Sequence, residues 1–317
     1  MPEGNELQVN PTLTNVSIQY RPDGLIGDQV LPDFGVIKKQ GDFKKYVKDD
    51  RFTIPDDVIG PKSEANEVEW TVDEDTYSCK DYGLDDFVSN DEQAQATGGP
   101  FNALIDATEF VTDLFMLAKE KRQADLVFAP GTYPAGNKVL LAGTSQWSDF
   151  ANSDPLGDIE TAKLAVWGNP NTLVFGAETW SMMRRHPDII KSVIALGPLL
   201  DHRGLATLRG VAELFEMEQA LVGRTRYNTA AKGQAASFSR LWGKHAAVLN
   251  IRRPSLRGLF FGANYLWTPP GQQARVAGTI PQPSRGLRGG VKVRVGETYV
   301  NKIVAADTGY FIEDAIA

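Results

Sequence analysis

The stretch NALIDATEFVTDLFMLAKEKRQADLVF, residues 102 to 128, decides the fold. Apolar residues recur along it at the i, i+3, i+4 and i+7 spacing of one helix face. Its acids come early and its bases late, as the helix dipole favours. The pattern predicts a helix about 40 Å long, at ~1.5 Å per residue, which would serve as a strut. The predicted apolar face consists of Leu104, Ala107, Val111, Leu114, Phe115 and Ala118, with Phe110 and Leu117 widening it. We expect this face to be buried against strands within residues 291 to 305.

Before the strut, the sequence predicts an arm followed by a projecting loop. The first forty residues are rich in Pro, Gly and Asn and lack a sustained period, which predicts an extended arm. Residues 36 to 47 are strand-like, whereas residues 48 to 69 hold many acids and few large apolar side chains. Alternation returns around residues 68–72 and 82–87, which suggests the two arms of a long hairpin. Such a hairpin is only marginally stable unless another surface covers it.

After the strut, helices and strands mix without regular βαβ alternation. Asp154-Pro155 starts a helix whose apolar face ends at Val166, and residues 172–175 predict a buried strand. Further helices are expected at residues 178–185, 188–196 and 207–215. Further strands are expected at residues 217–222, 246–251, 258–267, 291–295, 299–305 and 310–312. The fold class is therefore α+β.

Charge is distributed unevenly along the 317 residues, whose net charge is -7. Residues 41 to 100 hold 16 acids and 6 bases, whereas residues 181 to 317 hold 9 acids and 19 bases. Opposite charges on the two parts would let copies of the chain pair head to tail. No apolar run approaches the ~18 residues of a membrane helix, and the first ten residues lack a signal-peptide pattern, so we expect neither membrane insertion nor that export route. The single cysteine, Cys79, excludes an internal disulfide.

The search for catalytic motifs gives no candidate. His186, His202 and His245 show no paired metal spacing, and Gly243-Lys244-His245 lacks the upstream glycine and the Ser/Thr of a phosphate loop. Neither a dinucleotide fingerprint nor a nucleophile elbow occurs. The clustered acids lack the calcium-loop pattern, and the arginine pairs come without a nucleic-acid-binding module. We therefore predict no enzymatic activity, no metal and no cofactor.

Several segments occur in a familiar order. They are Leu25 to Pro32 with Gly41 to Tyr46, Pro170 to Gly176 with Trp180 and His186 to Asp188, Ala220 to Ala230 with Leu241 to Lys244, and Ala306 to Ile312. Together with the arm, the acidic hairpin and the strut, they resemble the major capsid proteins of tailed bacteriophages, which have the Hong Kong 97 type fold. The likeness covers nearly the whole chain and rests on loose patterns rather than on one invariant motif.

The resemblance implies a division of the chain into an arm, a peripheral domain and an axial domain. The expected parts are residues 1–35 as the N-terminal arm, 36–149 as the peripheral domain with an extended loop (about 47–80) and a spine helix (about 102–128), 150–285 as the axial domain, 286–305 as further peripheral-domain strands, and 306–317 as a return to the axial domain.

The resemblance also implies a function. The chain would be a structural major capsid protein that self-assembles into pentamers and hexamers of an icosahedral shell around the DNA genome. Because the arm reaches its first strand by Val36, a separate scaffolding protein is implied. The other expected partners are a portal protein, possibly a decoration protein, and packaged double-stranded DNA held without sequence-specific contacts. The expected location is the virion capsid, after assembly in the bacterial host cytoplasm.

Two other functions stay open from the sequence. An encapsulin-like nanocompartment shell would use the same fold, and the fold alone does not decide between the two. A soluble enzyme is the rival from another class, although the chain offers it only scattered histidines and carboxylates.

For contacts between subunits, we expect the acidic loop to lie over a neighbouring subunit. The candidate contact residues are Asp49, Asp50, Asp56, Asp57, Arg252 and Arg253. Under the alternative hypothesis, the loop's acids only keep unassembled subunits soluble and apart.

Overall fold

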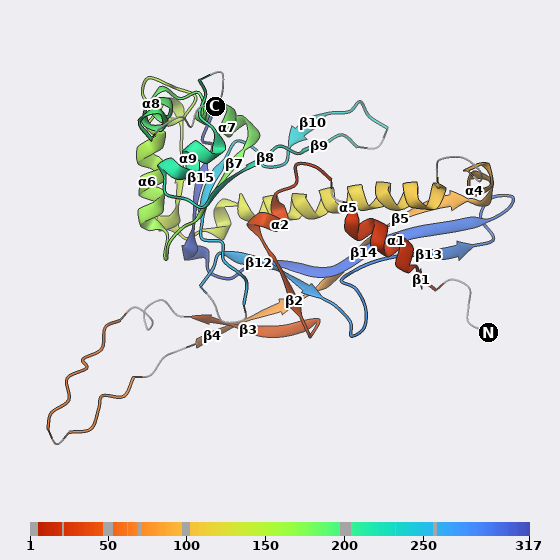
Figure 1. The fold of residues 1–317 in the computed structure, drawn as a ribbon, viewed down its shortest axis with the longest axis horizontal. Helices are drawn as coiled ribbons and strands as arrows, with labels where there is room; N and C mark the ends of the chain where they lie inside the picture. The colour runs from red at the N-terminus through yellow and green to blue at the C-terminus, as the bar shows by residue number, and fades with distance from the viewer. Residues whose placement is uncertain are drawn as a thin grey trace.

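The protein is flat and elongated, and it is built from two main sheets and one long helix (Figure 1). The computed structural model describes residues 6–20, 22–46, 53–61, 63–68, 72–96, 102–196, 204–231, 233–255 and 259–317. A five-stranded sheet with short helices forms one end, and a six-stranded sheet with the long helix along it forms the other. The predicted α+β class is confirmed. Within the described residues, no helix is long and apolar enough to cross a membrane.

The long helix is α5 (Ala103–Val127), which confirms the predicted strut. Asn102 caps it, because the Asn102 side chain accepts hydrogen bonds from two backbone N–H groups of the first turn. The first half of α5 lies along the six-stranded sheet, where Val111 joins a small apolar cluster. Near its end, Ala124 and Val127 pack against the five-stranded sheet. The helix therefore connects the two sheets.

The predicted apolar face of α5 is partly wrong. Leu114 is 43% exposed and Phe110 is 57% exposed, so neither is buried against the sheet. The face that is buried includes several polar side chains. Its residues are Ala107, Thr108, Val111, Thr112, Phe115, Met116, Lys119, Glu120, Gln123, Ala124 and Val127. Polar residues are stable there because other segments supply partners; the Oγ1 atom of Thr112, for example, lies 2.8 Å from Ser17 Oγ of the arm.

The arm contains two helices, so the prediction of a fully extended arm is wrong. Strand β1 (Gln8–Val9) leads into α1 (Pro11–Gln19), and α2 (Gly27–Val30) precedes strand β2 (Asp33–Val36). Asn10 and Pro11 supply the cap and the first position of α1. This helix packs on both α5 and the six-stranded sheet.

The six-stranded sheet has the order β1-β13-β14-β12-β2, and β5 pairs with the other edge of β14. Its longer strands are β5 (Lys80–Ser89), β12 (Gly262–Trp267), β13 (Arg275–Gln282) and β14 (Gly290–Ile303). Strand β14 runs without a break through the two strands expected at residues 291–305. Strands β12 and β13 lie within residues 150–285, so the division expected at residue 285 separates strands of one sheet.

A hairpin projects from the molecule next to β2 and β12, on the same side of Figure 1 as the five-stranded sheet. Its strands are β3 (Gln40–Tyr46) and β4 (Val72–Ser78), which pair antiparallel, and residues 53–61 and 63–68 extend beyond them (Figure 1, orange, lower left). The second arm was expected around residues 82–87. That expectation is wrong because those residues lie in β5 and pair with β14. Helix α4 (Asn90–Ala96) follows β5.

The five-stranded sheet has the order β6-β15-β11-β7-β8. Most of its strands and helices confirm predicted elements. The strands are β6 (Lys138–Leu140), β7 (Thr172–Gly176), β8 (Gln219–Gly223), β11 (Ala246–Leu249) and β15 (Gly309–Glu313). The helices are α6 (Pro155–Ala165), α7 (Ala177–Met183), α8 (Pro187–Leu196) and α9 (Leu208–Leu214). Short 3-10 turns lie at Pro130–Thr132, Ala135–Asn137, Gly143–Ser145 and Ala306–Thr308.

Side chains from the five-stranded sheet enter two different apolar clusters. In β7, Leu173 and Phe175 point into the cluster beneath helices α6 to α9. Val174 points the other way, toward Trp242 and the end of α5. Successive side chains of a strand point to opposite faces of its sheet. Both faces of β7 are apolar because other parts of the chain cover both of them.

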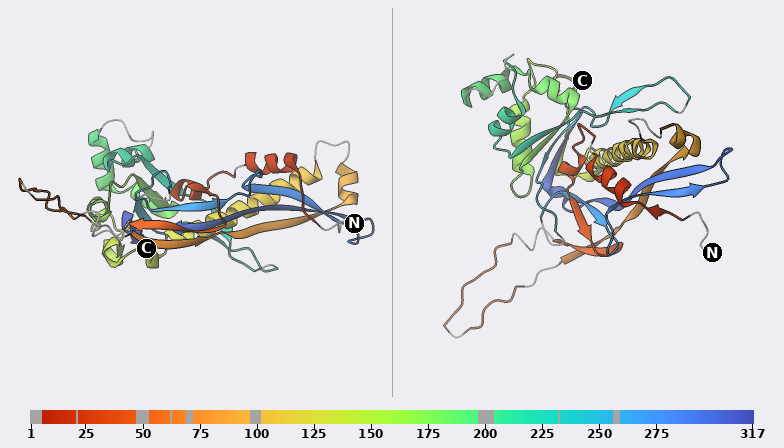
Figure 2. Two further views of the ribbon diagram at one scale, coloured as in Figure 1. Left: turned by 90° about the horizontal axis from the view of Figure 1, so that it is seen from below. Right: turned by 45° about the vertical axis from the view of Figure 1, so that its right-hand side comes forward.

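A second ribbon, β9 (Arg226–Asn228) with β10 (Phe238–Arg240), leaves the five-stranded sheet after β8. It runs beside α5 in Figure 1, and Figure 2 shows it leaving the plane of the molecule on the side opposite α1.

Candidate assembly surfaces and a buried charge cluster

The extended loop exposes apolar side chains that nothing in the described chain covers. Ile54 is 93% exposed, and Val58, Ile59 and Val68 are also exposed. Covering an exposed apolar side chain with another surface lowers the free energy by about 25 cal/mol for each Å² of apolar area removed from water. The loop is therefore suited to contact a second molecule.

The candidate acids of the loop lie in two places. Asp56 and Asp57 are exposed, and the Asp56 carbonyl oxygen accepts a hydrogen bond from the side chain of Asn66 across the loop. Asp49 and Asp50 lie outside the described residues. Asp57 forms no ion pair with any described residue, so its charge is available to a partner.

The candidate arginines follow strand β11. Arg252 and Arg253 are both exposed, and Arg252 Nε donates a hydrogen bond to Asn250 Oδ1 at 3.0 Å. Within the described ranges of one chain, no ion pair joins either arginine to a candidate acid. Their role as inter-subunit contacts stays a prediction.

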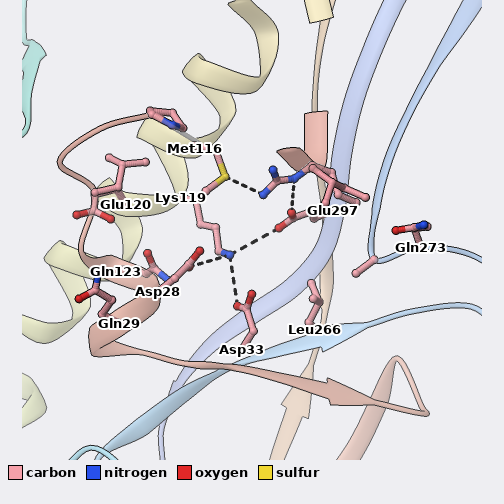
Figure 3. A pocket seen from close by; sticks show the side chains of 15 residues that line it. Asp28, Gln29, Asp33, Met116, Lys119, Glu120, Gln123, Leu266, Gln273 and Glu297 are labelled. Atoms are coloured by element: carbon pink, nitrogen blue, oxygen red, sulfur yellow. Dashed lines mark hydrogen bonds and ion pairs between the residues drawn. The ribbon is translucent and has the colours of Figure 1, made fainter. Parts of the chain in front are cut away.

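A buried charge cluster lies where the arm meets the strut, and sequence reasoning missed it (Figure 3). Lys119 of α5 is 1% exposed. Its Nζ lies 2.9 Å from a carboxylate oxygen of Asp28, 3.4 Å from one of Asp33 and 3.7 Å from one of Glu297. Arg275 also pairs with Glu297. The cluster therefore ties α2, β2, α5 and β14 together around a cavity of about 500 Å³.

The next residue of α5 holds the arm directly. The Glu120 carboxylate accepts hydrogen bonds from the backbone N–H groups of Ile26 and Gly27 and from Trp242 Nε1. A Cβ at residue 27 would lie 2.0 Å from Gln123 Oε1 and 2.5 Å from Glu120 Oε2. A larger residue at this position would displace the ends of the Gln123 and Glu120 side chains, and with them the hydrogen bond from the Gly27 N–H group.

Burial and charge pairing act in opposite directions in this cluster. Burial alone would lower the pKa of Lys119, but the carboxylates of Asp28, Glu297 and Asp33 outweigh it and raise that pKa. Burial raises the pKa of Glu120, although its hydrogen bonds from Ile26, Trp242 and Gly27 favour the charged form. Loss of water around Asp33 likewise raises the pKa of Asp33 against the opposing effect of Lys119.

The arrangement can hold segments together, and its chemistry is that of a structural ion-pair network. In the part of the chain that the structure describes, no three His, Cys, Asp or Glu side chains are placed to hold a metal ion. The one local signal is that Lys119 and Glu120 follow Phe115 and Met116 at the i+4 spacing of a helix face, on the buried side of α5.

Solved structures similar to this one define its class. A phage-related protein from Bordetella bronchiseptica RB50 has a TM-score of 0.74 and 24% identity, covering 98% of both chains. The capsid of cyanophage P-SCSP1u has a TM-score of 0.60, with 9% identity over 90% of this chain and 86% of that one. The SrpI encapsulin of Synechococcus elongatus PCC 7942 has a TM-score of 0.53, with 11% identity over 94% of this chain and 89% of that one. At these identities they show the fold alone, which is the Hong Kong 97 type fold.

Sequence relatives narrow this class further, although no family model matches the chain. The major capsid protein of Pseudomonas phage JBD67 is 40% identical over 313 residues, which is 98% of this chain and 97% of the relative. The major capsid protein of Burkholderia phage BcepMu is 27% identical, covering 96% of this chain and 95% of that relative. The chain belongs to the family of phage major capsid proteins.

Proposed function

We propose that copies of this chain assemble as pentamers and hexamers into a closed icosahedral shell that encloses double-stranded DNA. The observation that carries the proposal is the extended loop, whose described apolar side chains and acids are exposed and uncovered by the described part of their own subunit. Family membership supports shell formation over a soluble enzyme. The encapsulin-like alternative rests on a likeness of fold, whereas the 40% identity is to a phage capsid protein.

The two sheets would take different places in such a shell. The six-stranded sheet with α5 and the extended loop would form the peripheral domain, and the five-stranded sheet would form the axial domain. On the basis of sheet pairing, the peripheral domain would also include β12 and β13. Loops of the axial domain would then meet at the centres of the pentamers and hexamers.

The loop would lie over a neighbouring subunit and bring opposite charges together there. Asp49, Asp50, Asp56 and Asp57 would supply the negative side of such contacts, and Arg252 and Arg253 belong to the positive side. One exposed pair contributes only ~0 to 1 kcal/mol and is screened by salt. Repetition around every subunit would make the sum significant.

Assembly in the host cytoplasm would involve a separate scaffolding protein and a portal protein, and a decoration protein is a further possible partner. DNA would be held without sequence-specific contacts. The chain would be non-enzymatic, with its place in the virion capsid, as its relatives' name implies for them.

Reversal of the loop's charge tests this function. Asp49, Asp50, Asp56 and Asp57 are changed together to Lys, and shells of the variant and the unchanged chain are compared by sedimentation and thermal melting. We expect less assembly or a lower melting temperature for the variant. Unchanged assembly and melting would mean that the acids only keep subunits soluble. Native protein that sediments as monomer or dimer, even with scaffolding protein present, would contradict shell formation itself.

A further inference from the structure

Some of the charged side chains are paired within each subunit. Asp85 of β5 receives two hydrogen bonds from Arg294 of β14, at 2.6 and 2.7 Å. Other pairs act in the same way. They are Asp81 with Lys39, Asp91 with Arg288, Asp75 with Lys302 and Glu297 with Arg275. What remains unpaired therefore indicates which charges are available to other molecules.

Four of the acids that form no ion pair with another described residue lie on the extended loop. Asp56, Asp57, Glu64 and Glu67 are all exposed, and none forms an ion pair with another described residue. They alternate with exposed apolar side chains, Ile54 among them. The loop therefore offers a surface that is both acidic and apolar.

The clearest set of leftover bases lies on the β9–β10 ribbon. Residues 219 to 296 contain no Asp or Glu at all. In this stretch Arg224, Arg226 and Arg240 have no acidic partner within the described chain. Arg226 and Arg240 are directly opposite each other in the antiparallel register. Like charges placed this way repel and destabilise a ribbon, unless an anion lies over both.

The register also determines which way these side chains point. Tyr227 and Ser239 form the next pair along the ribbon, and the Tyr227 ring lies 5.3 Å from Lys121 Nζ of α5. That face of the ribbon is turned toward the strut. Arg226, Arg240 and Phe238 are on the other face, which points away from α5 because neighbouring residues of a strand alternate. We call these three residues the arginine face.

Phe238 distinguishes between two anionic partners, which are duplex DNA and an acidic protein surface. Phe238 is 66% exposed beside the two arginines. The phosphate backbone of duplex DNA is recognised by charge and polar groups and offers no apolar site for this ring. Aromatic residues and Arg are instead enriched at the centre of protein–protein interfaces.

We infer that the arginine face of the β9–β10 ribbon is the docking surface for the extended loop, residues 53–68, of a second copy of this chain. Acids of the loop would neutralise Arg226 and Arg240, and an apolar side chain of the loop would cover Phe238. This docking rests on the proposed function, because it requires subunits to meet in a shell. It also explains why the ribbon leaves the plane of the molecule, since a second copy can reach it there (Figure 2).

Disulfide mapping tests the contact directly. Full-length chains carrying Asp57→Cys are mixed with chains carrying Arg226→Cys before assembly, and the shells are mildly oxidised. The natural Cys79 should not interfere, because it is buried and burial raises the pKa of its thiol to about 11. We expect a disulfide between residues 57 and 226 of different chains. The matched control is Arg209→Cys on α9, an exposed arginine that should not crosslink to residue 57.

Charge reversal gives an independent measurement. Changing Arg226 and Arg240 together to Glu keeps a like-charge pair inside the ribbon. The circular dichroism spectrum of the folded subunit should therefore change little. The concentration needed for assembly should rise by about fivefold or more, as expected for the loss of ~1 kcal/mol per subunit. Adding Asp56→Lys with Asp57→Lys should restore assembly, whereas Arg209→Glu alone should have no effect.

The outcomes separate this contact from the shell function. Shells that form from the unchanged chain but give no 57–226 disulfide would overturn the docking and leave the shell function intact. Normal assembly of the Arg226→Glu, Arg240→Glu variant with reduced DNA retention would assign the arginine face to DNA instead, and would also overturn the docking. Failure of the unchanged chain to form shells would overturn the proposed function and the docking with it.

Discussion

The two sheets of this protein are stabilised in different ways. The five-stranded sheet lies between apolar clusters on both faces, and every residue of β7 and β11 is buried. The apolar clusters of the six-stranded sheet are smaller and separate, and ion pairs such as Asp85 with Arg294 and Lys119 with Glu297 connect its parts. One helix, α5, packs against both sheets.

This difference has a physical consequence. Apolar burial is non-directional, so it tolerates small shifts and stabilises broadly. A buried ion-pair network depends on every member, because removing one leaves the others charged and without their partner. The six-stranded sheet therefore relies more on such ion pairs than the five-stranded sheet does. Five predictions can break or sharpen this comparison.

The largest effect is expected in the five-stranded sheet. Phe175 of β7 is fully buried against Trp180, and Phe175→Ala should lower the free energy of unfolding by ~3 to 5 kcal/mol. Urea denaturation of unassembled chains, followed by circular dichroism, measures it. The control is Leu164→Ala on α6, because Leu164 is exposed and its loss should cost little. A loss below ~1 kcal/mol at Phe175 would contradict the description of this core.

A smaller loss is expected in the charge cluster. Lys119→Met leaves Asp28, Asp33 and Glu297 without their shared cation and should cost roughly 2 to 3 kcal/mol. The cost is moderated because Asp28 and Asp33 are half-exposed and Glu297 keeps Arg275.

The same cluster predicts a dependence on alkaline pH. Since the pKa of Lys119 is raised in the folded chain, its stabilising effect is complete below the unfolded pKa of about 10.4 and is lost as pH rises through the folded value. Unfolding of the native chain and the Lys119→Met variant at pH 8 and above pH 10.4 measures this. The native chain should lose more stability than the variant, and parallel losses would rule out the coupling.

One pair of variants tests whether Leu114 is buried, as the sequence pattern predicts, or partly exposed, as the structure shows. Because Leu114 is 43% exposed, Leu114→Ala should cost about 1 kcal/mol or less. Val111→Ala, one turn earlier on the buried face, should cost about 2 kcal/mol. If Leu114→Ala were the more damaging change, the orientation of α5 would be wrong.

The smallest effect is a pH dependence in the five-stranded half. Burial lowers the pKa of His186, whose Nδ1 accepts the Asp188 N–H at the start of α8. The unfolded chain therefore binds a proton more readily, and stability should fall as pH drops below about 6.5. His186→Asn keeps a capping side chain without a titratable group. Melting temperatures at pH 7 and pH 5 should fall less in the variant than in the native chain, and an equal fall would exclude His186 as the cause.

Local signals were enough to predict the elements that depend on local sequence. Apolar periodicity marked α5, Asp154 with Pro155 marked the start of α6, and the unbroken apolar run at residues 172–175 marked β7. Helix α1 was missed because two of its three buried side chains, Thr14 and Ser17, are polar, so the helix lacks an apolar period. They are satisfied by Ala277 and Thr112, far away in the chain.

The charge cluster and the ribbon surface could not be predicted from local sequence. The partners of Lys119 come from residues 28, 33 and 297, so they meet only through the tertiary fold. Strand β13 was also missed, because Gly278 and Pro281 are both unfavourable in strands. Gly278 is needed there, since a Cβ would lie 2.5 Å from the Gln8 carbonyl oxygen of β1.

The central claim is that this chain builds a closed shell in which each extended loop lies on a neighbouring subunit. Electron cryomicroscopy of the assembled full-length protein tests it most directly. We predict closed icosahedral particles with pentamers and hexamers, in which density for residues 53–68 lies against another subunit. Particles in which those residues contact no neighbour, or a preparation that contains only monomers and small oligomers, would contradict the claim.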